Sequence, residues 1–195
     1  TVSFSARTNE VVLIKQRKLP HAFELTRTKN FNQTARAITN MTVRGAGAIG
    51  ATAAYGLAQG ARAFTGKTEA AFARHLLRVY ETLAAARPTA VDLVNALNEV
   101  RAVMTAGKTT TSISQKQKLA LRAAGKFADD DVNHCEAIGK HGAKLIKNGT
   151  RVLTHCNAGW LAFVDIGSAT APMYAAQAKG KNFHVFCAET RPRSQ

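Results

Sequence analysis

The sequence predicts a mixed α/β fold, in which a small sheet and several helices precede the start of a parallel sheet. Three observations support this assignment. A β-branched run near the N-terminus predicts a strand, and helical periodicity dominates from residue 30 to about residue 147. After Asn148, two short apolar runs flank one helical run. The order strand, helix, strand is typical of two parallel neighbouring strands.

The first expected elements are two strands and one helix. Residues 10–16 (EVVLIKQ) contain the β-branched run, and residues 23–26 alternate as a second strand would. We expect these strands to form a small antiparallel sheet. Asn30 is a favourable N-cap for the helix that follows it. The apolar positions of that helix are spaced to form one face: Phe31, Ala35, Ile38 and Met41.

Three further helices are expected next. Residues 45–63 are small and apolar, which is typical of a buried helix that packs closely against its neighbours. Thr68 is placed to cap a helix that runs through Ala86. Pro88 ends that helix and can start the next one, over residues 89–105.

The remaining pattern predicts one long helical stretch and then the parallel unit. Residues 113–147 are mostly helical, with an interruption expected near the three aspartates at 129–131. Strands are expected over 152–156 and 183–187, with a helix over about 168–179 between them. The pattern ends where a parallel sheet would continue, so we expect a further part of the protein after Gln195.

Composition narrows the class of protein. The 195 residues are 46% hydrophobic, enough to bury a core without disulfides or metal ions. An odd number of cysteines, three, argues against a secreted disulfide scaffold and favours a cytoplasmic location. The sequence contains no apolar run of membrane-spanning length and no signal-peptide pattern, so no membrane association is expected.

The charge balance is strongly basic. Lys and Arg number 27 against 12 Asp and Glu, for a net charge of +15. Such an excess indicates a polyanionic partner, an acidic part elsewhere in the protein, or a site for phosphorylated small molecules. The basic residues are scattered and do not alternate with aromatic residues. Nucleic acid binding is therefore not expected.

A glycine-rich segment at residues 45–50 matches G-x-G-x-x-G. No solid strand precedes it, as a dinucleotide fingerprint would require, so no nicotinamide cofactor is expected. Arg44 beside the glycines at a helix N-terminus favours a phosphate site instead. Tight packing of a buried helix is another explanation of the glycines and is compatible with that site. Arg87 is a second arginine before a helix, which alone is weak evidence.

Cys156 closes the first predicted parallel strand and precedes residues 157–159 (NAG). Ligands of open α/β sheets bind beyond the carboxyl ends of the strands. A thiol there could serve acid–base or nucleophilic chemistry, and a buried structural cysteine is the equal alternative. Thr154 and Cys156 would share one strand face, and His155 would point to the other. Cys187, which ends the next strand, is expected in the core, and no metal site is expected because the His-Cys pairs lack zinc-site spacing.

Four stretches together carry a family resemblance: VRGAGAIGATAAYGLA, ARPTAVDLVNAL, GAKLIKNGTRVLTHCNAG and AETRPRSQ. In this order they strongly resemble the methylthioribose-1-phosphate isomerase family. That family is related to ribose-1,5-bisphosphate isomerases and to regulatory subunits of translation initiation factor two-B. The resemblance covers residues 11–195, nearly the whole chain.

The resemblance implies a small sheet plus helical N-terminal domain, over 1–128, and the start of an incomplete Rossmann-like domain, over 129–195. It also implies a homodimer and a chain that continues into a missing C-terminal half. The residues that match the family's substrate-binding positions are Arg44, Gly45, Ala46, Arg87 and Gln195. Its reactive cysteine matches Cys156, and its catalytic aspartate belongs to the missing half.

The activity that the resemblance implies is aldose–ketose isomerisation of a 5-substituted ribose 1-phosphate, without metal or other cofactor. A non-catalytic regulatory subunit of the initiation factor two-B type is the alternative. Three positions depart from the usual isomerase motifs: Lys15, Gly47 and Ala188. The Gly-Ala-Gly form is more similar to paralogues acting on 5-deoxyribose 1-phosphate, so 5-methylthioribose and 5-deoxyribose 1-phosphates both remain candidates. We also expect Arg44 and Arg87 to converge on one phosphate.

Overall fold

The N-terminal sheet has three antiparallel strands in the order β1-β2-β3, in a computed structural model that describes residues 1–106 and 111–189. The strands are β1 (Val2–Ser5), β2 (Glu10–Ile14) and β3 (Leu25–Thr28). The predicted second strand begins two residues later than expected, and β1 was not predicted. Val11 and Leu13 of β2 are fully buried and attach the sheet to the helical core.

Five helices follow, and the first four confirm the predicted order. The capping predictions hold: the Asn30 side chain accepts the amide of Gln33 at 3.0 Å, and Thr68 accepts that of Ala71 at 3.3 Å. No helix within the described ranges is long and apolar enough to cross a membrane. The helices are α1 (Phe31–Thr39), α2 (Ala46–Arg62), α3 (Glu69–Ala84), α4 (Val91–Thr105) and α5 (Ile113–Gly142).

Helix α2 forms the centre of the larger core. It contacts α1, α3, α4 and α5 and is buried along nearly its whole length. Small residues make this possible, as the sequence predicted. A Cβ at Gly60, for example, would lie 2.5 Å from a methyl carbon of Val79 in α3. Helix α2 is thereby held rigidly among four neighbouring helices.

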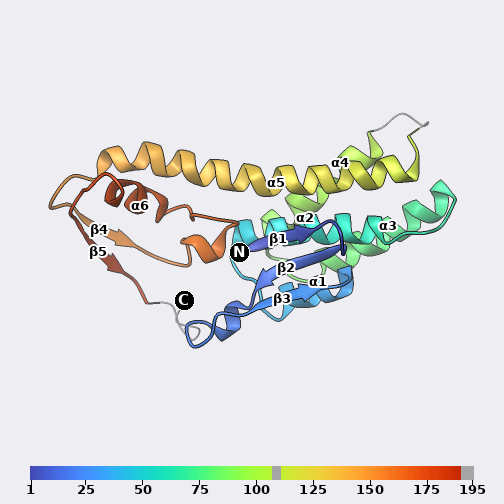
Figure 1. The fold of residues 1–195 in the computed structure, drawn as a ribbon, viewed down its shortest axis with the longest axis horizontal. Coiled ribbons are helices and arrows are strands. Elements are labelled where there is room, and N and C mark those ends of the chain that lie inside the picture. The colour runs from blue at the N-terminus through green and yellow to red at the C-terminus, as the bar shows by residue number, and fades with distance from the viewer. Residues whose placement is uncertain (107–110, 190–195) are drawn as a thin grey trace.

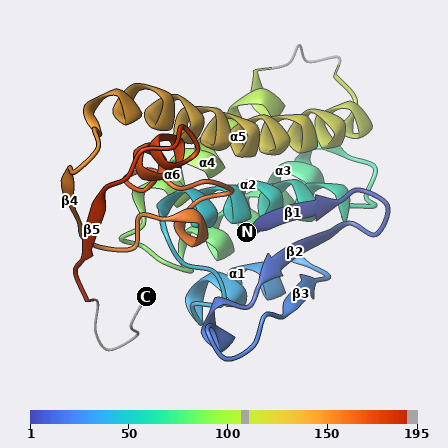
Figure 2. The ribbon, with the colours of Figure 1, turned by 60° about the vertical axis from the view of Figure 1, so that its left-hand side comes forward.

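Helix α5 is continuous over 30 residues, so the predicted interruption at residues 129–131 is wrong. The aspartates do not break the helix, because Lys126 pairs with Asp130 one turn on and Asp131 accepts a loop amide. Ala128 and Cys135 remain buried on either side of them. Figures 1 and 2 show α5 running alongside α2 and α4 at one end and alongside α6 at the other. The expected domain boundary at 128/129 lies in the middle of this helix.

A strand–helix–strand unit follows the 3₁₀ turn η2 (Ala143–Leu145). Strands β4 (Arg151–Thr154) and β5 (His184–Cys187) pair in parallel, joined through helix α6 (Ala171–Gln177), as predicted. Strand β4 ends two residues earlier than expected. The β1–β3 and β4–β5 sheets lie at different ends of the molecule (Figure 2). The fold is therefore helical with one small antiparallel and one short parallel sheet.

Candidate anion-binding site at the start of helix α2

The start of α2 has the features of an anion site. Gly45 is the N-cap residue, with φ of +95°, and no side chain caps the helix. No acidic residue lies in its first turn. The first amides of a helix have no partner within it, and they carry the positive end of its dipole. Gly45 and Ala46 thus carry backbone N–H groups of the kind that bind phosphate.

Arg44 directly precedes this helix start and is itself buried, with 8% of its surface exposed. Its Nη2 donates to the carbonyl oxygen of Gln16 at 3.3 Å. The Gln16 side-chain amide donates in return to the carbonyl oxygens of Arg44, at 3.5 Å, and Leu161, at 2.6 Å. Gln16, in the 3₁₀ turn η1 (Gln16–Lys18), therefore links Arg44 to Leu161 of the 3₁₀ turn η3 (Trp160–Ala162).

The loop between β4 and α6 folds back onto the start of α2. Ala162 packs so closely on Gly45 that a Cβ there would lie 2.2 Å from the Ala162 Cα. Asp131 of α5 accepts the amide of Val164 at 2.7 Å. The loop that begins just after β4 thus contacts a helix start more than 100 positions earlier in the chain. The structure therefore brings together the two segments that the sequence selected.

Cys156 lies in this loop, two residues after β4, as an exposed free thiol with φ of +70°. It was expected to end the strand and to share a face with Thr154. That expectation is wrong, because β4 ends at Thr154 and its alternation does not reach Cys156. The left-handed backbone at position 156 sets the direction of the thiol instead.

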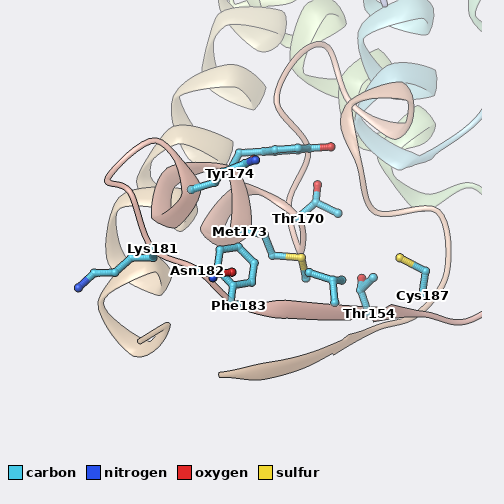
Figure 3. Close-up of a pocket in the computed structure, with 10 residues that line it drawn as sticks. Thr154, Thr170, Met173, Tyr174, Lys181, Asn182, Phe183 and Cys187 are labelled. Carbon is cyan, nitrogen blue, oxygen red and sulfur yellow. The ribbon is translucent and has the colours of Figure 1, made fainter. Parts of the chain in front are cut away.

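Cys187 was expected in the core, and this too is wrong. It is exposed at the end of β5, where it pairs in register with Thr154. Both residues line a cavity of about 370 Å³ between the short sheet and α6, together with Met173 and Tyr174 (Figure 3). Cys135 is the buried cysteine, and burial raises the pKa of its thiol to about 11. Cys135 is therefore a packing residue.

Arg87 lies in the connection between α3 and α4 and is partly buried. It does not start a helix, because α4 begins at Val91. The Thr39 hydroxyl, at the end of α1, donates to the carbonyl oxygen of Ala86, the residue before Arg87, at 3.2 Å. A Cβ at Gly50 would lie 3.2 Å from a carbonyl oxygen in the first turn of α4.

This connection therefore lies at the same end of the helical core as Arg44. The convergence of Arg44 and Arg87 on one phosphate stays a prediction. Gln195, the remaining expected ligand, lies outside the described residues.

Two site residues were missed at the level of sequence: Gln16 and Asp131. Gln16 is 1% exposed and lies two residues after the apolar strand β2, and such burial is unusual for a polar side chain. Asp131 falls on the buried face of α5, between Ala128 and Cys135. Loss of water around its carboxyl group raises its pKa above the ordinary value, and Asp92 acts in the same direction. Among the described residues, no cluster of three His, Cys, Asp or Glu could hold a metal ion.

These features define a helical α/β protein in which the uncapped start of α2, a candidate anion site, packs against the loop after the first parallel strand. The chain belongs to the initiation factor 2 subunit family, whose profile matches residues 42–195. The family resemblance inferred from the motifs is thereby confirmed.

Curated relatives point to one branch of this family. A methylthioribose-1-phosphate isomerase of Methylorubrum extorquens is 46% identical over 202 aligned residues, which cover all of this chain and 53% of the relative. Methylthioribose-1-phosphate isomerase 1 of Pseudothermotoga lettingae is 42% identical over 187 residues, 96% of this chain and 53% of the relative. The chain thus spans about half the length of these curated relatives.

Two solved structures with different names share this fold. The translation initiation factor eIF-2B subunit delta from A. fulgidus superposes with a TM-score of 0.85 at 36% identity, over all of this chain and 55% of that one. The 5-methylthioribose 1-phosphate isomerase from Pyrococcus horikoshii gives 0.82 at 32% identity, over 96% of this chain and 59% of that one. Both support the fold described above.

Proposed function

We propose that the complete protein is an aldose–ketose isomerase that converts a 5-substituted ribose 1-phosphate to the ribulose 1-phosphate. 5-Methylthioribose 1-phosphate is the first candidate substrate, in keeping with the names of the curated relatives, and 5-deoxyribose 1-phosphate is the second. One structural observation supports the proposal most strongly: the loop that carries Cys156 is packed against the Arg44–Gly45 helix start.

In this proposal the start of α2 binds the phosphate. The guanidinium of Arg44 and the backbone amides at Gly45 and Ala46 supply hydrogen bonds and positive charge. Arg87, from the neighbouring connection, adds a second guanidinium, and Gln195 is assigned as a further substrate-binding residue because of the family resemblance. Fixing the phosphate positions the ring for reaction, which lowers the entropic cost of the chemical step.

Cys156 would act at the sugar itself. Phosphate on the anomeric oxygen locks the ring, so the enzyme must first assist ring opening and then move hydrogen from C2 to C1. Either a proton transfer through an enediol or a direct hydride shift requires positioned acid–base groups in a water-poor site. We assign the Cys156 thiol as one such group, with an aspartate from the remainder of the protein as its partner and no metal or other cofactor.

The organisation of the complete protein is part of the same proposal. The strand–helix–strand unit would begin a Rossmann-like domain at about residue 129, after a helical N-terminal domain over 1–128. The complete protein would work as a cytoplasmic homodimer.

A regulatory subunit of the initiation factor two-B type is the competing function. The A. fulgidus structure carries such a name. The curated relatives at 42–47% identity are instead named methylthioribose-1-phosphate isomerases, so this alternative is not favoured. A subunit of that type would have no need of Cys156.

The test is turnover by the complete protein with 5-methylthioribose 1-phosphate, followed by NMR as the ketose appears. Cys156→Ser should lower kcat at least about a hundredfold, the usual scale for a lost proton-transfer group. Cys187→Ser is a matched control, since Cys187 is an exposed thiol at the end of the adjacent strand, and it should stay within about threefold of the unmodified enzyme. Absence of ketose, or near-normal turnover by Cys156→Ser, would refute the assignment.

A further inference from the structure

The loop between β4 and α6 is a closed unit. The amide of Ser168 donates to the carbonyl of Ala158 at 3.1 Å, and Gly159 and Gly167 form an isolated β-bridge. Its base at Ala158 lies two residues after Cys156. Movement of this loop would therefore move Cys156 with it.

Two side chains from elsewhere in the fold fasten the loop to the helical core. Gln16, after β2, donates to the carbonyl of Leu161 at 2.6 Å. Asp131, from α5, accepts the amide of Val164 at 2.7 Å. Leu161 and Val164 are three residues apart, on either side of Ala162, which packs on Gly45. The loop is thus held at two points around its contact with α2.

Both side chains also contact the start of α2. The Gln16 amide reaches the carbonyl of Arg44, and its backbone carbonyl accepts from the Arg44 guanidinium. The second oxygen of Asp131 lies against Gly47, where a Cβ would be only 2.1 Å away. Each residue therefore touches both the helix start and the loop.

Neither side chain is suited to bind a substrate phosphate. Gln16 is 1% exposed, and its amide group already donates to two carbonyl oxygens. Asp131 carries a carboxylate, which repels an anion. We propose that Gln16 and Asp131 are positioning residues, which hold the loop of residues 158–168 against the start of α2 and so fix Cys156 relative to Arg44. The catalytic part of this inference rests on the proposed isomerase function.

The chain offers a matched control in Gln59. This glutamine is also fully buried, at the far end of α2, where its amide donates to the carbonyls of Asn9 and Thr28 at 2.8 and 2.7 Å. Gln59→Met and Gln16→Met each remove buried hydrogen bonds from a side chain of similar length. Both should lower Tm, because unpaired buried carbonyls are costly. Only Gln16→Met should affect the site.

Kinetics of the complete protein test the positioning role. Gln16→Met should raise KM, because it removes the hydrogen bond that the Gln16 side chain donates to the Arg44 carbonyl. It should also lower kcat at least about tenfold, because small misplacements of reacting groups slow the chemical step strongly. Asp131→Ala should lower kcat to a similar extent without raising KM, since it removes a negative charge beside the phosphate site. Asp131→Asn, which keeps an acceptor for Val164, should recover most of kcat. Gln59→Met should leave both constants within about twofold.

Hydrogen exchange keeps this inference separate from the proposed function. The amides of residues 158–168 should exchange at least about tenfold faster in Gln16→Met and Asp131→Ala, but not in Gln59→Met. If the unmodified protein forms no ketose, the isomerase proposal fails, and exchange still decides whether these residues hold the loop. Unchanged exchange in both variants, or faster exchange with unchanged kcat and KM, overturns the positioning role. Gln16 and Asp131 are tested by separate variants. If one variant does not fold, the other variant still tests the positioning role.

Discussion

Gly45 shows how one residue can serve both the backbone and the packing of the site. Its φ of +95° suits glycine, and Ala162 occupies the space that a Cβ would need. Gly45→Ala should therefore lower the free energy of unfolding by about 2–4 kcal/mol, the sum of left-handed strain and a backbone clash. Gly149→Ala is the control, because Gly149 has φ of +77° with open space around it. It should cost only about 1–2 kcal/mol.

Denaturant unfolding of the two variants measures this difference. If both variants lose the same free energy of unfolding, the contact between Gly45 and Ala162 does not contribute to stability. A larger loss for Gly45→Ala confirms that the loop is packed tightly on the helix start.

Asp131 gives a pH dependence whose sign is fixed. Burial raises the pKa of its carboxyl above 3.8, Asp92 adds to this rise, and the Val164 amide, His134 and the Thr1 amino group oppose it. The folded protein therefore binds the Asp131 proton more tightly than the unfolded chain does. The stability that this protonation contributes is complete below the pKa of the unfolded chain, and it is lost as the pH rises through the pKa of the folded protein. Asp131→Asn should be most destabilising, relative to the unmodified protein, in acid and least so near neutral pH. Denaturant midpoints measured from about pH 3 to pH 7 test this, and a cost that grows with pH would contradict it.

Local residue patterns predicted part of this site. Arg44 and Gly45 could be selected because a short segment carries the arginine, the glycines and the helix start together. Gln16 and Asp131 could not, because their roles come from contacts with Leu161 and Val164, which depend on tertiary structure. An isolated polar residue on an apolar face was the only local signal.

Among the elements, long periodic helices and their caps were predicted well, and short or charged segments were not. The strand β1 has four residues with only Val2 buried, so its pairing with β2 is its main source of order. The aspartates at 129–131 resembled a break because Asp is a weak helix former. Contacts that stabilise them, an ion pair and a loop amide, are visible only in the folded chain.

Helix α5 contains two glycines whose surroundings predict opposite effects of alanine. Gly125 lies in its middle with no atom within 4 Å of the Cβ position, so Gly125→Ala should stabilise the protein by about 0.5–1 kcal/mol through a better helix propensity. Gly142 ends the helix, and a Cβ there would lie 2.5 Å from the Pro172 ring of α6. Gly142→Ala should lower Tm. Calorimetry on both variants tests the pair, and a stabilising Gly142→Ala would show that α6 adapts at no cost.

At the scale of the whole molecule, the two ends differ in how much they bury. The larger cluster includes residues of both the first sheet and five helices, whereas the cluster under the short sheet has three buried members: Ala143, Ile146 and Ala176. On the β4–β5 sheet, Leu153 and Phe186 are 74% and 41% exposed. The helical end should therefore be the more stable of the two, because buried apolar area is the main source of folding free energy.

The last prediction follows from this asymmetry and from the proposed chemistry. The chain spans about half of its curated relatives, and the proposed partner of Cys156 is an aspartate outside it. Purified residues 1–195 should therefore keep helical circular dichroism, because the larger cluster is complete around α2, but turn over 5-methylthioribose 1-phosphate at least about a thousandfold more slowly than the complete protein. Losing one acid–base group costs about two to four orders of magnitude, and Cys156 alone cannot move a proton from C2 to C1 without an acceptor. Robust turnover by residues 1–195 would mean that the reaction needs no residue beyond them, and the acid–base assignment would have to be rebuilt from groups within this chain.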